Sequence, residues 1–145
     1  MPALIPVSEK NLDRAALVLR LVLATVFLVH GYQKLFVYGF SGVTNSFRHM
    51  GVPLAELIAP VICVLEFFGG LALLVGAYTR VVATLLACDM LGAIILVHAK
   101  NGFSAGKGGV ETVLGNFGML LAVALIGAGA YSIDATLARR RATSP

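Results

Sequence analysis

Residues 57–99 read LIAPVICVLEFFGGLALLVGAYTRVVATLLACDMLGAIILVHA, two long apolar runs on either side of a short turn. Each run is close to the roughly 20 residues that an α-helix needs to cross the hydrocarbon core of a bilayer. Only residues 76–79 join the two runs. The helices that they predict must therefore be antiparallel neighbours.

The same pattern extends outward in both directions. Two further apolar blocks lie at residues 15–36 and 113–131, in a chain of 145 residues that is 59% hydrophobic and 12% charged. A soluble domain of this length needs more polar surface to cover its core. Within a bilayer, a helix pairs every backbone N–H and C=O inside its own segment. We therefore predict one all-α integral membrane domain over residues 1–145, an up-down-up-down bundle with helices near 15–36, 57–75, 81–99 and 113–131.

The basic residues suggest an orientation, because four spans place both termini on one side. Cationic residues that flank the spans on this side are Lys10, Arg14, Arg80, Arg139, Arg140 and Arg141. Those on the other side are Lys34, Arg48, Lys100 and Lys107. Lys and Arg are enriched on the cytoplasmic side of membrane proteins, so both termini are expected in the cytoplasm. The net charge of +4 reflects these flanks and does not predict binding to nucleic acid.

The two longer connections differ in character. Residues 37–56 include Phe40 and Phe47 and predict an amphipathic segment that lies at the membrane interface. Residues 100–112 are rich in glycine and are expected to be mobile.

Ionisable residues fall within or at the ends of the predicted spans: Arg20, His30, Lys34, Glu66, Asp89 and His98. A charge at the bilayer centre costs about 2.5–3.5 kcal/mol, so such residues usually face one another or a wet cavity. At about 1.5 Å of rise per residue, Arg20, Glu66 and Asp89 lie at a similar depth on three helices. We expect Arg20 to pair with at least one of these acids. The layer would then serve as a structural salt bridge, as a proton path or as the floor of a small-molecule cavity.

A second polar layer is predicted at the face opposite the termini. His30 and Lys34 are four residues apart and share one helix stripe. His98 ends the third span, and Glu111 and Asn116 lie at the start of the fourth. In the simplest alternative, these are interfacial side chains that reach toward water.

Aromatic residues, including Tyr32 and Phe103, surround the predicted mouth of this layer. Paired histidines at such a mouth suit a quinone head group, whose carbonyls need hydrogen-bond donors and whose reduction needs protons. The histidines and Glu111 lack the tight spacing of metal ligands, so no metal site is predicted. Cys63 and Cys88 are expected in the core without a disulfide, because their depths differ by about 6 Å.

Short motifs along most of the chain resemble the DoxX family. They lie at residues 19–21, 30–35, 66–70, 79–80, 98, 101–103, 111 and 127–134. The resemblance extends from about residue 15 to residue 137. It implies a four-helix protein of the bacterial inner membrane, similar to the large membrane subunit of thiosulfate:quinone oxidoreductase. It also implies a redox or stress-response enzyme as partner.

These observations lead to three hypotheses about function, of which the first is the leading one. In the first, a redox partner docks on the membrane subunit, which exchanges electrons and protons with the quinone pool. His30 and His98 would donate to the quinone, and Lys34 would stabilise developing negative charge. Tyr32, Phe103 and Glu111 would help to bind it, and no haem or flavin site is recognisable. In the second, the protein is a non-catalytic anchor for a redox or stress-response complex. In the third, it is a small transporter, which would require a homo-oligomer.

Overall fold

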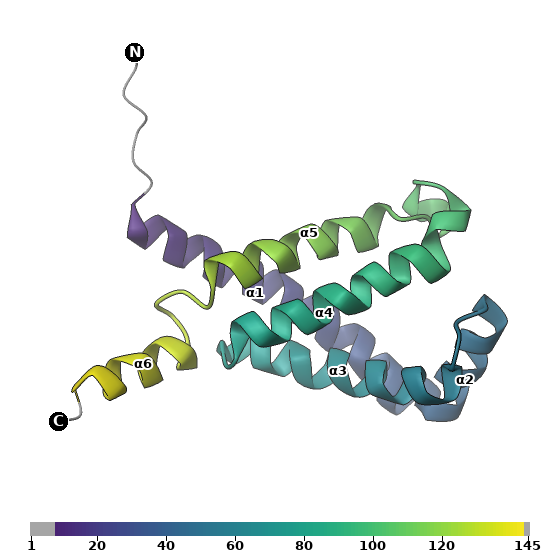
Figure 1. The fold of residues 1–145 in the computed structure, drawn as a ribbon, viewed down its shortest axis with the longest axis horizontal. Helices are drawn as coiled ribbons and strands as arrows, with labels where there is room; N and C mark the ends of the chain where they lie inside the picture. Colours follow the sequence, from purple (N-terminus) through teal and green to yellow (C-terminus); the bar gives the residue numbers. More distant parts are fainter. Residues whose placement is uncertain (1–7, 144–145) are drawn as a thin grey trace, which may run out of the picture.

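The computed structural model describes residues 8–143, and every regular element in this range is helical. The long helices are α1 (Glu9–Tyr32), α3 (Ala55–Val75), α4 (Thr79–Ala93) and α5 (Glu111–Ile126). Helix α1 packs against α3 and α5, and α4 packs against the same two helices. Two shorter helices, α2 (Gly39–Met50) and α6 (Ile133–Thr143), lie toward opposite ends of the long axis (Figure 1). The predicted all-α class is thus confirmed for the described part of the chain.

The stretch that predicted a helical hairpin forms one. By length and composition, Ala55–Val75 and Thr79–Asn101 are apolar enough to cross a membrane. Helix α5 is apolar but shorter. The predicted end of this helix at residue 131 is wrong, because α5 stops at Ile126 and Gly127 turns the chain with a φ of 91°. At the same end of the fold, α1 begins earlier than predicted, at Glu9.

Glycines allow α1 and α3 to approach closely. A Cβ atom on Gly31 would lie 2.4 Å from the backbone nitrogen of Phe67. A Cβ atom on Gly70 would lie 2.9 Å from the backbone nitrogen of Leu28. Small residues permit this approach of two helix backbones, which van der Waals contacts then stabilise. The resulting antiparallel register fixes which side chains of the two helices can meet.

Two π-helical segments continue the long helices. Gln33–Tyr38 follows α1, and Ile94–His98 follows α4. Lys34 lies in the first segment, and His98 ends the second. Such wide turns occur often at functional sites, because they change the direction in which side chains point. Neither segment was predicted from the sequence.

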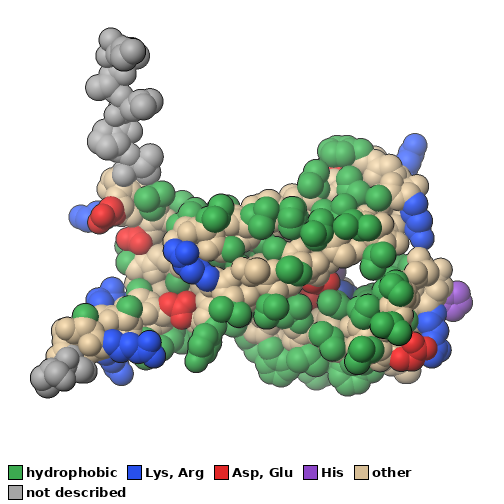
Figure 2. All heavy atoms as spheres, in the orientation of Figure 1, with side chains coloured by type: hydrophobic (Ala, Val, Ile, Leu, Met, Phe, Trp, Pro, Cys, Tyr) green, Lys and Arg blue, Asp and Glu red, His purple; other side chains and the backbone are tan. Residues whose placement is uncertain are grey.

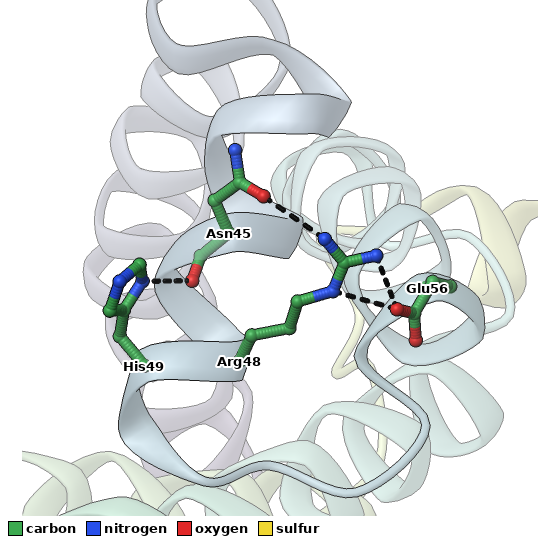
Figure 3. Close-up of polar contacts among 4 residues, drawn as sticks. All are labelled: Asn45, Arg48, His49 and Glu56. Carbon is green, nitrogen blue, oxygen red and sulfur yellow. Dashed lines mark hydrogen bonds and ion pairs between the residues drawn. The ribbon is translucent and has the colours of Figure 1, made fainter.

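Polar contacts tie α2 to the beginning of α3. Arg48 forms an ion pair with Glu56, in which its Nε donates to Oε1 at 2.7 Å, and its Nη1 donates to Asn45 Oδ1 at 3.3 Å (Figure 3). His49 Nδ1 lies 2.7 Å from the carbonyl oxygen of Asn45. On the apolar side of α2, Phe47 packs against a buried cluster shared with α3. The first long connection is therefore an amphipathic helix, as its pattern predicted.

The predicted pairing of Arg20 with Glu66 or Asp89 is wrong. The buried guanidinium of Arg20 instead donates hydrogen bonds of 2.8–3.0 Å to four backbone carbonyl oxygens, those of Leu73, Leu74, Ala128 and Tyr131. The depth estimate failed because it took the same membrane boundary for every helix. Helix α1 extends past the end of α3, so Arg20 lies beside that end, about 15 Å of helix away from Glu66.

Candidate functional site

A cavity of about 720 Å³ lies between the long helices, toward the end of the molecule where α2 packs. Its volume is in the range of small-molecule and cofactor sites, about 300–1,000 Å³. Most of its wall is apolar. Figure 2 shows the visible face hollowed toward this end. The polar side chains that line the cavity are His30, Lys34, Glu66, Asp89, His98, Thr112 and Asn116.

The cavity joins residues from both predicted polar layers. His30, Lys34 and His98 were predicted in one layer, and Glu66 and Asp89 in the other. They meet because Gly31 packs against Phe67 of α3. Lys34 lies one helical turn after Gly31 and therefore reaches Glu66, the neighbour of Phe67. A single mixed site thus replaces the two separate layers.

An ion pair forms the most buried part of this site. Lys34 Nζ lies 2.6 Å from Glu66 Oε1, and the Glu66 side chain is only 4% exposed. The carboxyl group of Asp89 in α4 lies near that of Glu66 and interacts with it. Helix α1 with its extension, α3 and α4 therefore each contribute one ionisable side chain to a common cluster.

The two histidines of the cavity are held through the same ring nitrogen. His30 Nδ1 lies 2.9 Å from the carbonyl oxygen of Val26, and His98 Nδ1 lies 2.7 Å from that of Gly108. A carbonyl oxygen can only accept, so Nδ1 carries the proton in both rings. When such a ring is neutral, its Nε2 carries no proton and can accept one.

His98 also stabilises the glycine-rich connection. The amide of Asn101 donates to the same carbonyl oxygen of Gly108, at 3.1 Å. The carboxylate of Glu111 accepts a hydrogen bond of 2.8 Å from the backbone N–H of Ala105. The connection that was expected to be mobile therefore forms a hydrogen-bonded turn, and Glu111 serves this turn rather than the cavity.

Two aromatic residues of the predicted mouth also lie outside the cavity lining. Tyr32 is 54% exposed and packs against Phe36, with ring centroids 5.2 Å apart. Phe103 is 64% exposed. Tyr32 lies on a side of its helix that does not line the cavity, and Phe103 lies in the glycine-rich connection, outside any helix. Instead, α2 supplies Phe47 and Met50 to the wall, a role that its sequence did not indicate.

Asn116 and Cys88 complete the lining. Asn116, which was predicted in the same polar layer as His98, is buried in α5. Cys63 is buried in the core as predicted, whereas Cys88 is exposed and lines the cavity. Both thiols are free.

The sequence comparisons agree with this arrangement. The DoxX family model matches residues 15–99. This chain belongs to the DoxX family. The matched part of this DoxX protein contains all of the ionisable residues that line the cavity, and of the polar lining only Thr112 and Asn116 lie beyond it.

Named relatives cover most of the chain. Inner membrane protein YqjF of Escherichia coli is 34% identical over 91% of this chain and 98% of its own length. Putative oxidoreductase CatD of Bacillus subtilis is 35% identical over 66% of this chain and 68% of its own. An uncharacterized membrane protein of Mycobacterium tuberculosis is 34% identical over 84% of this chain and 80% of its own. No solved structure matches the chain significantly.

Proposed function

We propose that this DoxX protein is an inner-membrane subunit of a redox complex and binds a quinone head group in its cavity. A partner oxidoreductase would supply the electrons. The observation that carries the proposal is the convergence of His30, Lys34 and His98 on one largely apolar cavity. The names of two relatives, an inner membrane protein and a putative oxidoreductase, support the location and the class of chemistry.

The surface supports a position across the bilayer. Hydrophobic side chains cover the middle of the molecule, whereas charged side chains gather toward its two ends (Figure 2). We propose that α1, α3, α4 and α5 form an up-down-up-down transmembrane bundle. The end that carries Lys10, Arg14 and α6 would face the cytoplasm. A reporter fused to the C-terminus tests this orientation, which activity of a periplasmic reporter there would contradict.

The cavity has the groups that quinone reduction requires. Conversion of a quinone to a quinol takes two electrons and two protons, and the partner's reduced centre is the source of the electrons. His30 and His98, once protonated at Nε2, can donate hydrogen bonds and protons to the two carbonyl oxygens. Lys34 stabilises negative charge that develops on a carbonyl oxygen, because its ammonium keeps N–H groups beyond the one that faces Glu66.

The histidines provide a sharp test, since the chain has three of them and His49 lies outside the cavity lining. The double variant His30→Gln, His98→Gln keeps hydrogen-bonding side chains that cannot carry the proton. We expect partner-dependent quinol formation to fall by about 100-fold in this variant, as is usual when general acid catalysis is lost. His49→Gln is expected to have the activity of the wild type.

Co-purification of the partner, measured on the same variants, separates the proposal from the anchor hypothesis. If the protein is only an anchor, quinol formation will follow the amount of bound partner. Full quinone turnover in the folded double variant would contradict a role of the histidines and leave the anchor function in place.

A further inference from the structure

Two carboxyl groups meet on the wall of the cavity without a donor between them. Glu66 Oε2 and Asp89 Oδ2 are both buried, and no donor group in residues 8–143 reaches either atom. The two carboxyl groups instead lie near each other and interact. Because buried polar atoms in proteins are almost always hydrogen-bonded, this contact requires an explanation.

The explanation is that a carboxyl group can donate a hydrogen bond only when it is protonated. An ionised carboxylate can only accept hydrogen bonds, so two ionised carboxylates repel each other. One proton converts the contact into a hydrogen bond, as it does in paired-carboxyl active sites. The contact is thus attractive only when the pair holds a proton.

The charges around Glu66 and Asp89 also indicate that this pair holds one proton. Lys34 is the only Lys or Arg among the residues that line the cavity, and it faces Glu66. The histidines use Nδ1 to hold backbone carbonyls, and the remaining polar neighbours from α5, Thr112 and Asn116, carry no charge. Cys88 lines the same cavity, and Cys63 lies near Lys34 and Glu66. One ammonium and two carboxyls are electrically balanced when the carboxyls share one proton.

We propose that Glu66 and Asp89 share one proton in the resting protein and deliver it to the ligand of the cavity. The delivery step rests on the function proposed above, whereas the shared proton does not. In that step, the partner supplies two electrons to the quinone. The proton leaves the carboxyl pair and forms an O–H bond on one quinone oxygen, and one protonated histidine supplies the second proton to the other oxygen. The pair then carries two negative charges beside Lys34. A proton that enters through the histidines at the cavity wall restores the resting state.

Infrared spectroscopy of the purified protein in lipid vesicles at neutral pH, without quinone, tests the shared proton directly. A protonated carboxyl gives a C=O stretching band that shifts in deuterated water. We expect a band equivalent to one such group per chain, and we expect Glu66→Gln and Asp89→Asn each to abolish it. Both amides can donate to the remaining carboxylate, so the contact and the fold are retained. The matched control Glu56→Gln, at an exposed residue paired with Arg48, should leave the band unchanged.

Removal of the Lys34 ammonium should increase the infrared band, whereas the amide variants should abolish it. In Lys34→Met, both carboxyls must be protonated for neutrality, so the band area should about double. A wild-type spectrum without the band, or a band that persists in both amide variants, would overturn the shared proton.

The delivery step is tested by quinol formation. Asp89→Asn should lower the rate by about 100-fold, while the dissociation constant for quinone should stay within a few-fold of the wild type. An unchanged rate would overturn delivery even if the infrared band is present. Failure of the wild type to bind quinone would instead reject the proposed function, and the infrared result would still decide whether the proton is shared.

Discussion

Arg20 and Lys34 show how two cations within apolar stretches can be satisfied in different ways. Arg20 lies beside the end of α3, where the last carbonyl groups have no partner within the helix. Its planar guanidinium has five N–H donors, enough to bind Leu73 and Leu74 together with two carbonyls from the segment after α5. Lys34 has a compact ammonium and pairs with a carboxylate instead. Arg20 thus stabilises a backbone junction, and only Lys34 belongs to the cavity.

The substitution Arg20→Met tests this assignment. The variant leaves several buried carbonyl oxygens without donors, and each hydrogen bond from a charged group contributes about 1.5–3 kcal/mol. We therefore expect the free energy of unfolding in detergent to fall by about 3 kcal/mol or more. Arg14→Met, at an exposed position of the same helix, should change it by less than about 0.5 kcal/mol. Equal stabilities of the two variants would contradict the role given to Arg20.

At the scale of elements, the N-terminus of α4 receives its cap from a distant part of the chain. Asp134 in α6 accepts hydrogen bonds from the backbone N–H groups of Tyr78 and Thr79, at 2.8 and 2.9 Å. Partial burial opposes ionisation of Asp134. The N–H groups of Thr79 and Tyr78, together with the charge of Arg20, outweigh this effect, so the pKa of Asp134 lies below its ordinary value of 3.8. The cap joins α6 to the turn between α3 and α4.

This lowered pKa makes the cap sensitive to acid. A carboxyl with a lower pKa in the folded state stabilises that state fully above its unfolded pKa, and the stabilisation is lost as the pH falls through the folded pKa. We expect Asp134→Ala to be less stable than the wild type by about 1 kcal/mol at neutral pH. This difference should shrink once the pH drops below 3.8. Chemical unfolding of both proteins across this pH range would measure it, and a constant difference would exclude an ionised cap.

The sequence could predict those helices and turns that are determined by interactions between residues close in the chain. The apolar blocks and the short 76–79 turn predicted the α3–α4 hairpin, and an amphipathic pattern predicted α2. The early end of α5 was missed, because residues 127–132 are apolar enough to continue the helix and are instead drawn around Arg20. The π-helical segments were missed because no local residue pattern distinguishes them from ordinary helix.

At the scale of the whole molecule, the site depends on the register between helices. Counting residues from the helix ends identified the ionisable side chains that matter, and five of them do line one cavity. The count could not show that Gly31 brings α1 against Phe67, which places Lys34 on Glu66 and leaves Arg20 at the far end. The depth of a residue along a helix could be estimated from the sequence. Whether Tyr32 and Phe103 line the cavity could be learned only from the packed structure.

The central claim is that the cavity holds a quinone, and filling the cavity tests it most directly. Gly92 lines the cavity, and a Cβ atom placed on it would have no neighbour within 4 Å, so Gly92→Phe introduces a ring into empty space. Gly118 also has open space around a Cβ atom but lies outside the lining, which makes Gly118→Phe the matched control.

The measurement is the amount of quinone per chain that remains bound when each protein is purified from membranes in mild detergent. Wild type and Gly118→Phe should retain quinone equally. Gly92→Phe should retain at least about tenfold less, because a loss of 1.4 kcal/mol in binding already gives that factor. Undiminished quinone in the folded Gly92→Phe variant would contradict the claim.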